Sequence, residues 1–326
     1  MAKKAGKAVV GIDIGATKIL VGVLKGRRVL STVKAKTAPA EGEREFFATI
    51  AATVGKALEE ACLQPRQLAA VGAGCPGVLD TRSDRIVSSA NIPFIKDYPL
   101  ARKLEKIFKV PAAVENDANM GLYGEWHFGA AAGCRNVAGF FLGTGIGGAL
   151  ILDGRLYRGS SGAAGEMGHI FVDPLGPGCG CGNTGCLEAL AGRLAIAGEA
   201  AVLAARGGAP RLLSEAGADV RKLKSGVLAR AVEAGDKQLK ELVRRKAALV
   251  GIAMANIVNT LDPECLVLGG GLVEAMGDLI VPAAEESMRR HSMPDISRHV
   301  TVAPAKLGDL AIVMGAAQWV RDQTDA

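Results

Sequence analysis

The sequence has few aromatic residues, 4% of its 326 positions, and no uninterrupted apolar stretch long enough to cross a membrane. Its most apolar run, residues 9–24, contains Asp13 and Lys18, so no transmembrane segment is predicted. Long basic runs are missing too: lysines and arginines occur in short groups without interleaved aromatics, although the formal net charge is +6. This scatter is typical of solvated faces and argues against a nucleic-acid-binding surface.

An apolar leader segment with a cleavage site is also absent, because the chain starts MAKKAGK. We therefore predict a cytoplasmic protein whose thiols stay reduced. Its seven cysteines, an odd number, argue against a disulfide framework. What the sequence has in abundance is glycine, with 43 residues, and apolar residues, which make up 49%. This composition suits an α/β enzyme with many close backbone approaches, and the length indicates two domains, or one with large insertions.

The most distinctive stretch is residues 165–188, which read GEMGHIFVDPLGPGCGCGNTGCLE. Three thiolates and one imidazole make a complete ligand set for tetrahedral Zn²⁺, and four protein ligands leave no position for a reactive water. A structural zinc site is therefore predicted, with a redox or incidental thiol cluster as the alternative. Two flanking carboxylates, Glu166 and Glu188, can hold a polyol. The predicted zinc ligands are His169, Cys179, Cys181 and Cys186.

Alternating apolar runs and turn residues predict a mixed sheet in the first part of the chain. The expected elements are strands at 8–13, 18–24 and 28–36, a helix at 43–62, a strand at 68–75, a helix at 98–108 and a strand at 110–114.

The pattern then restarts, and two glycine-turn hairpins, DIGATKILVGVL and LGTGIGGALIL, resemble one another. Their likeness hints at an internal duplication. A last helix at 310–321 is expected to return to the N-terminal domain. The remaining elements expected are a helix at 117–128, strands at 137–142 and 147–152, helices within 192–261 and a strand at 265–268.

Three glycine-rich turns predict a nucleotide. In the first, glycine lets the backbone approach a phosphate, Thr17 offers a hydroxyl and Asp13 can hold Mg²⁺ directly or through water. Residues 143–148, GTGIGG, supply a second nest of backbone N–H groups. Residues 269–271 follow a strand and precede an expected helix, where a flat ring can lie against the backbone. For the first two turns, an ordinary β-hairpin is the alternative.

The segment Glu115-Asn116-Asp117 lies between a strand and a helix. Asp117 can accept a proton from a sugar hydroxyl that attacks a γ-phosphate, and Asn116 can bind neighbouring hydroxyls. The alternative is an ordinary helix N-cap, for which Asn and Asp are both favoured. Combined with the phosphate turns and the cluster of Glu and His, this segment predicts an ATP:polyol phosphotransferase.

Through these motifs the chain resembles the ROK family of sugar kinases and sugar-responsive repressors, in the actin/hexokinase-like superfamily. The resemblance extends from Val9 to about Val320, and its most specific element is GEMGH followed by CGCGNTGCLE. It implies an α/β fold of two RNase H-like (actin-like ATPase) domains around a cleft, with a zinc-binding insertion in the large domain. The small domain would be residues 1–116 completed by helix 310–326, and the large domain residues 117–309.

The resemblance also implies roles for individual residues. Asp117 would be the general base, and His169 would use one ring nitrogen for zinc and the other for a sugar hydroxyl. The sugar would be held by Gly77, Asn91, Asn116, Asp117, Glu166, His169 and Glu188. ATP would be held by Asp13, Gly15, Thr17 and Lys18 as the first phosphate motif, by Gly143, Thr144, Gly145 and Gly147 as the second, and by Gly269, Gly270 and Gly271 as the adenosine motif.

We therefore expect an ATP- and Mg²⁺-dependent hexose 6-kinase with a structural Zn²⁺ and with glucose as the favoured sugar. Kinases for fructose, mannose, N-acetylglucosamine and N-acetylmannosamine share these motifs and remain alternatives, as do ADP or polyphosphate as donors. A non-catalytic sugar sensor is a further alternative. The family's repressors carry a helix-turn-helix domain before the first phosphate motif, and the twelve residues before Asp13 are too few for one. The resemblance implies a homodimer or homotetramer.

Overall fold

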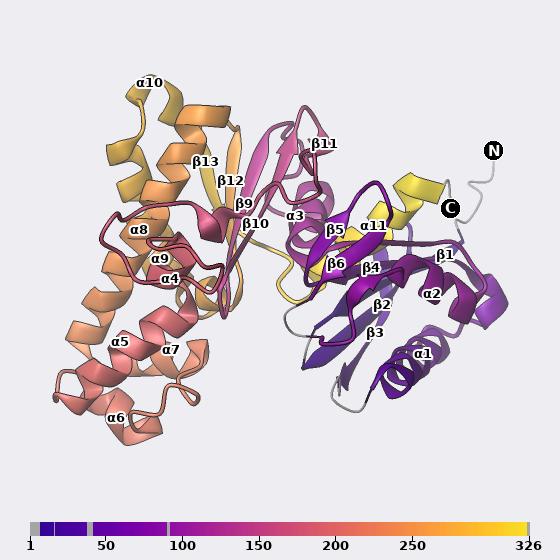
Figure 1. Cartoon of the computed structure of the whole chain (residues 1–326), viewed down its shortest axis with the longest axis horizontal. Coiled ribbons are helices and arrows are strands. Elements are labelled where there is room, and N and C mark those ends of the chain that lie inside the picture. Colours follow the sequence, from indigo (N-terminus) through magenta and orange to yellow (C-terminus); the bar gives the residue numbers. More distant parts are fainter. Residues whose placement is uncertain (1–6, 16, 38–41, 90–91, 325–326) are drawn as a thin grey trace. The chain divides into compact units, whose positions relative to one another are not determined.

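The computed structural model describes residues 7–15, 17–37, 42–89 and 92–324. Contacts within the chain divide it into two compact units, each built around a five-stranded sheet (Figure 1). Unit 1 comprises residues 1–133, 156–164 and 309–326, and unit 2 comprises residues 134–155 and 165–308.

The sheet of unit 1 has the order β3-β2-β1-β4-β8. Strands β1 and β2 form an antiparallel hairpin, whereas β1, β4 and β8 run parallel, so their carboxyl ends lie at one sheet edge. Its strands are β1 (Ala8–Ile14), β2 (Lys18–Lys25), β3 (Arg28–Lys36), β4 (Leu68–Cys75) and β8 (Ala112–Asn116), and its helices are α1 (Glu43–Glu60), α2 (Leu100–Phe108), α3 (Asp117–Phe128) and α11 (Leu310–Thr324), with a short 3₁₀ turn at Pro65–Gln67.

Helix α11 packs directly on the backbone of the unit 1 sheet, because glycines leave its surface open. A Cβ atom at Gly11 or Gly72 would overlap the carbonyl oxygens of Val313 and Ala316 respectively. Gly315 likewise lets α11 pack against the backbone of α3. The glycine content therefore serves a close helix–sheet contact here.

Unit 1 also contains a small antiparallel sheet that the sequence did not predict, of β5 (Val78–Asp80), β6 (Arg85–Ser88) and β7 (Lys96–Tyr98). The helix expected from Tyr98 begins instead at Leu100. Tyr98 ends β7, where its hydroxyl donates to Glu43 Oε1 at 2.6 Å. The strand expected at 110–114 lies two residues later, at Ala112–Asn116.

The sheet of unit 2 has the order β11-β10-β9-β12-β13, which repeats the strand arrangement of unit 1. The two mixed sheets confirm the α/β prediction and match the likeness of the two hairpins. The strands are β9 (Val137–Leu142), β10 (Ile146–Leu152), β11 (Arg155–Leu156), β12 (Cys265–Gly269) and β13 (Thr301–Pro304). The helices are α4 (Leu187–Ala191), α5 (Arg193–Ala205), α6 (Pro210–Ala216), α7 (Ser225–Glu233), α8 (Lys237–Leu261), α9 (Gly271–His291) and α10 (Pro294–Ser297), with a 3₁₀ turn at Met167–His169.

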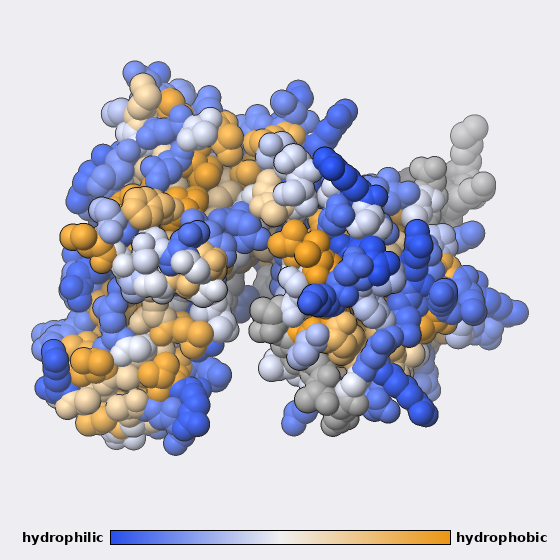
Figure 2. Space-filling view, in the orientation of Figure 1, coloured by the Kyte–Doolittle hydropathy of each residue, from blue (hydrophilic) through white to orange (hydrophobic). Residues whose placement is uncertain are grey.

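The boundary between the units lies later in the chain than the predicted division after residue 116. Helix α3 belongs to unit 1 because it packs along α11, with Gly124 close to the Ala311 carbonyl. Hydrophilic residues are spread over the visible surface of each unit (Figure 2). Within the described residues, no helix combines the length and the apolar character that a membrane span needs.

Candidate active site

The first glycine turn joins β1 to β2 at the carboxyl end of β1. The Gly15 N–H donates to the Lys18 carbonyl at 2.9 Å, and a Cβ at Gly15 would lie only 2.8 Å from that oxygen. The Thr37 hydroxyl donates to the Gly15 carbonyl at 2.9 Å, and the Thr37 N–H donates to the Thr17 carbonyl at 3.1 Å. The turn is therefore braced by Thr37, the residue that follows β3. Ala16 of this turn, and the predicted sugar ligand Asn91, lie outside the described residues.

Asp13 and Asp117 lie at the same edge of the unit 1 sheet. Asp13 pairs in register with Gly74 on β4, and a Cβ at Gly74 would lie 3.4 Å from the Asp117 Cα. Burial, and then the charge of Asp117, raises the pKa of Asp13 to about 7, while Lys18 acts in the opposite direction. The charge of Asp117 therefore opposes the ionisation of Asp13, and carboxylates placed this close together are the type of ligand that divalent cations prefer.

Asn116, and not Asp117, caps helix α3. Its Oδ1 accepts from the N–H groups of Ala118 at 2.9 Å and Asn119 at 3.1 Å. Its Nδ2 donates to the Gly77 carbonyl at 3.1 Å, which connects two of the predicted sugar ligands. The N-cap interpretation therefore applies to Asn116, and one amide proton remains for a further acceptor. Asp117 is the first helical residue, and its Oδ1 also accepts from the Ala118 N–H at 2.9 Å.

The second glycine turn, between β9 and β10, is mounted on the start of α5. The N–H groups of Arg193 and Leu194 donate to the carbonyls of Gly143 and Thr144 at 3.1 and 3.3 Å. Glu188 reaches the same turn from α4, where its Oε2 accepts from the Ile146 N–H at 2.8 Å. A side chain at residue 145 would collide with this carboxylate, so any residue other than glycine there would have to displace Glu188. The structure thus joins the predicted sugar ligand Glu188 to the predicted phosphate turn.

The four predicted zinc ligands converge, with one ligand atom from each lying within 4.8 Å of all the others. The Sγ atoms of Cys181 and Cys186 are 3.7 Å apart, as are Cys179 Sγ and His169 Nδ1. A tetrahedral Zn²⁺ with Zn–S bonds of about 2.3 Å places its sulfur ligands about 3.8 Å apart. The distances and the donor set therefore fit zinc.

Local backbone contacts shape the zinc cluster. Cys179 N–H donates to the Asn183 carbonyl at 2.7 Å, and Gly182, with φ +94°, turns the chain between them. A hydrogen bond involving the Asn183 backbone holds the pKa of the Cys181 thiol below its usual value. On the other side of the His169 ring, Nε2 lies 4.0 Å from Glu166 Oε2. If Nδ1 binds the metal, Nε2 and Glu166 can therefore share one hydroxyl group.

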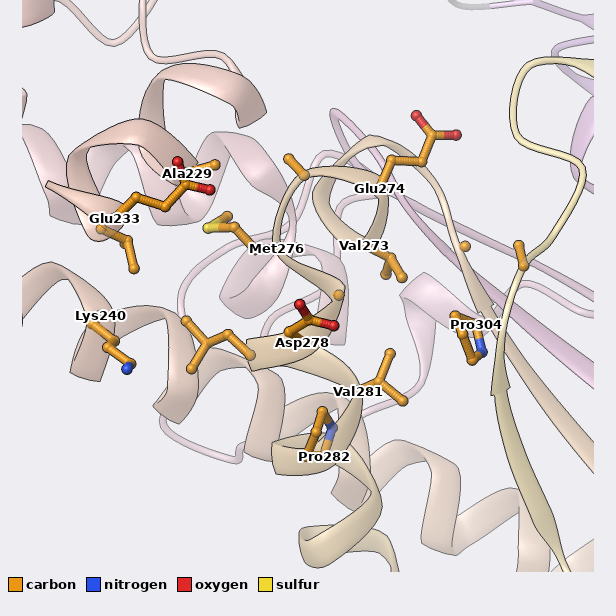
Figure 3. Close-up of a pocket in the computed structure, with 16 residues that line it drawn as sticks. Ala229, Glu233, Lys240, Val273, Glu274, Met276, Asp278, Val281, Pro282 and Pro304 are labelled. Carbon is orange, nitrogen blue, oxygen red and sulfur yellow. The ribbon is translucent and has the colours of Figure 1, made fainter.

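The third glycine motif opens into a cavity of about 850 Å³ in unit 2. Gly269 ends β12 and lines this cavity, while Gly270, with φ +85°, passes close to the backbone of Leu142. Met276, Asp278 and Val281 of α9 lie between Glu233 and Lys240 on one side and Pro304 on the other (Figure 3). The lining mixes apolar side chains with four charged ones, Glu233, Lys240, Glu274 and Asp278, so it offers both packing surface and polar partners to a ligand.

Two charged residues of these sites were given no role from the sequence. The Glu115 side chain is fully buried, accepts from the Asn116 N–H and from Asn119 Nδ2, and lies 3.7 Å from Arg158; burial raises its pKa. Arg193 is only 8% exposed and donates to the Thr144 hydroxyl oxygen at 2.9 Å. The signal in the sequence for Arg193 is a single cation at the start of a largely apolar helical run, whose only other charged residue is Glu199.

The predicted site residues fall into two groups. Those in unit 1 are Asp13, Gly15, Thr17, Lys18, Gly77, Asn116 and Asp117; those in unit 2 are Gly143, Thr144, Gly145, Gly147, Glu166, His169, Glu188, Gly269, Gly270, Gly271 and the three zinc-cluster cysteines.

The chain is similar to ROK proteins over nearly its whole length, and the ROK family model matches residues 9–323. A glucokinase from Halalkalibacterium halodurans is 33% identical over 97% of this chain and 96% of its own. Two solved structures, each aligned over 97% of this chain and 99% of their own, are a ROK hexokinase from Thermus thermophilus (36% identity, TM-score 0.79) and a ROK family glucokinase from Streptomyces griseus in complex with glucose and AMPPNP (33%, 0.83). A xylose repressor from Caldicellulosiruptor bescii is 26% identical over 94% of this chain and 76% of the repressor. These similarities confirm the family resemblance and the fold it implies.

Proposed function

Because the chain belongs to the ROK family, we propose that it transfers the γ-phosphoryl group of ATP to the 6-hydroxyl of a hexose, and that this hexose is glucose. The observation that carries the proposal is the full-length similarity to a glucokinase whose structure holds glucose and AMPPNP, an ATP analogue. A curated glucokinase of similar length and identity gives independent support.

The acid–base chemistry is assigned to unit 1. Asp117 accepts the proton of the attacking hydroxyl, and its position is fixed because Asn116 caps the same helix turn. Asp13 would hold Mg²⁺, which supplies charge neutralisation at the β- and γ-phosphates. Burial and the neighbouring Asp117 make the Asp13 carboxylate costly without a cation, which favours metal binding there.

The sugar and the phosphates are assigned mainly to unit 2. Backbone N–H groups of the turn at 143–148 would offset the charge of the transferred phosphoryl group, apart from those of Gly143 and Ile146, which donate to the Gly145 carbonyl and to Glu188. Glu166 and His169 Nε2, which lie 4.0 Å apart, share a sugar hydroxyl. Glu188 presents its second carboxylate oxygen to the sugar, since Oε2 is held by Ile146. Zinc would be held by His169 and the three cysteines, and would fix the imidazole orientation.

The adenosine moiety is assigned to the cavity between α7, α8, α9 and β13. Val273, Met276 and Val281 offer apolar surface to the base, and Asp278 offers a carboxylate to amine or hydroxyl donors. We also propose a homodimer or homotetramer, which light scattering on a sizing column tests directly.

The decisive experiment is an ADP-release assay with Mg·ATP against glucose, fructose, mannose, N-acetylglucosamine and N-acetylmannosamine. Preferred turnover of glucose, with glucose 6-phosphate as product, supports the proposal. Preferred turnover of another sugar keeps the kinase mechanism and replaces the substrate. Sugar binding by calorimetry without turnover of any sugar would show a sensor, the class to which the similar repressors belong.

A further inference from the structure

A buried positive charge lies beneath the second phosphate turn with no anion beside it. Arg193 is 8% exposed, and arginine is rarely this buried unless it is paired. Its guanidinium donates to two uncharged oxygens, the Thr144 hydroxyl at 2.9 Å and the Leu223 carbonyl at 3.4 Å. Among the residues that the structure describes, no carboxylate forms an ion pair with it. A buried cation without an anion destabilises a fold, so its retention calls for a reason.

Arg193 also lies at the end of a helix where positive charge is already concentrated, so an anion is expected beside it. Arg193 is the first residue of α5, a 13-residue helix, so its charge adds to the positive end of the helix dipole. The backbone N–H groups of Arg193 and Leu194 hold the carbonyls of Gly143 and Thr144. The turn thus rests on a helix end and a guanidinium whose positive charges reinforce each other. The missing partner is therefore expected at this turn.

The hydrogen bond from Arg193 also fixes the direction of the Thr144 hydroxyl. A guanidinium only donates, so Thr144 Oγ1 accepts there and its own proton must point elsewhere. Thr144 is exposed, whereas Arg193 is buried. The hydroxyl proton is therefore free to point toward the exposed side of the turn, where a phosphate oxygen could accept it.

We propose that Arg193 is a positioning residue of the phosphate site: it holds Thr144 as a hydrogen-bond donor to a phosphate of the bound nucleoside triphosphate and supplies positive charge behind the glycine turn. This inference rests on the proposed function insofar as it takes ATP as the phosphoryl donor. It does not depend on which sugar is phosphorylated.

A functional and a merely structural role for Arg193 predict opposite changes in stability. Arg193→Met keeps an unbranched side chain of similar length and removes the unpaired charge. If the charge serves the ligand, the variant melts at the same or a higher temperature, while the dissociation constant for Mg·AMPPNP rises about 10- to 100-fold, as expected for a lost charge-assisted interaction. If the role is structural, the melting temperature falls and the affinity of the folded protein is retained.

The test is calorimetric titration of the full chain with Mg·AMPPNP, without sugar, together with thermal unfolding of each variant. Arg206→Met, at the exposed opposite end of α5, is the matched control and should bind like the wild type. Arg193→Lys should recover part of the affinity for Mg·AMPPNP. Thr144→Val should lose affinity even though Arg193 is intact in that variant. If Arg193→Met folds and binds Mg·AMPPNP as tightly as the wild type, the inference is wrong. If Arg193→Met does not fold, the same result for Thr144→Val overturns the inference.

The same titration separates this inference from the proposed function. A wild-type protein that binds Mg·AMPPNP through Arg193 but phosphorylates no hexose would contradict the kinase proposal and leave the phosphate site standing. A wild-type protein that does not bind Mg·AMPPNP contradicts the inference itself.

Discussion

Replacing Asp13 by asparagine should stabilise unit 1 at alkaline pH while removing the carboxylate assigned to Mg²⁺. The reason is that burial and the charge of Asp117 raise the pKa of Asp13 from 3.8 to about 7. Ionised Asp13 is therefore a destabilising group in the folded, metal-free protein. Asparagine has nearly the same shape and carries no charge, so it removes this cost.

The size and sign of the effect follow from proton linkage. A folded-state pKa about three units above the unfolded value corresponds to about 4 kcal/mol once the pH exceeds 7. Between the two pKa values the folded state binds the extra proton, so wild-type stability falls as the pH rises. At pH 5 the raised pKa of Asp13 lowers the free energy of unfolding by only about 1.6 kcal/mol. The advantage of Asp13→Asn should therefore grow by roughly 2–3 kcal/mol between pH 5 and pH 8.

Tryptophan fluorescence makes this measurable for unit 1 alone. Both tryptophans of the chain, Trp126 and Trp319, lie in unit 1, on α3 and α11. Urea unfolding in magnesium-free buffer at several pH values would give the difference in unfolding free energy between variant and wild type. A difference that is independent of pH would refute the reasoning.

Asp309 provides a control of opposite sign. Lys34 and Lys18, at 2.5 and 2.9 Å, hold the pKa of Asp309 below its usual value. The ionised form of Asp309 is therefore stabilising, and that stabilisation is lost as the pH falls through its lowered pKa. Asp309→Asn should accordingly lower stability at neutral pH, and the penalty should disappear under acidic conditions.

Three further outcomes are expected. Asp117→Asn should keep glucose binding but lower kcat by about 10²–10⁴-fold, and near-normal turnover would remove Asp117 from the role of base. Cys179→Ser and Cys181→Ser should each lower zinc content and sugar affinity together, and unaltered zinc by elemental analysis would exclude these ligands. The adenosine cavity carries more carboxylates than cations on its lining, so turnover with inorganic polyphosphate should be about tenfold or more slower than turnover with ATP. Glu233→Lys should reduce this difference in rate. Equal rates with both donors in the wild type would contradict the assignment of the cavity.

The parts of the site that sequence reasoning found are those encoded within a few neighbouring residues. The zinc ligands all lie between residues 169 and 186, where close spacing and donor chemistry limit the possible arrangements. The hairpin of β1 and β2 is likewise a local structure, because the Gly15–Lys18 hydrogen bond closes it. Most strands of both sheets were predicted within one or two residues for the same reason.

What sequence reasoning could not find depends on distant contacts. Helix α3 joins unit 1 through α11, which follows about 180 residues later in the chain. The choice of Asn116 over Asp117 as the cap depends on the exact end of β8, since both residue types are favoured there. The burial of Arg193 depends on how unit 2 folds, and the sequence around one arginine does not show which residues will cover its side chain.

The glycine-lined contact of α11 with β1 and β4 also determines when unit 1 can be completed during synthesis. Residues 134–308, all of which precede α11, must be made first, which takes roughly 10–35 seconds at typical translation rates. Throughout that interval α11 is missing from the face of the emerging unit 1 sheet on which it packs, although α3 already contacts β4 there. Unit 2 is nearly contiguous in the chain and can fold meanwhile. The half of the protein that leaves the ribosome first is thus the half that is finished last, and a nascent chain stalled before residue 309 would expose that sheet to aggregation.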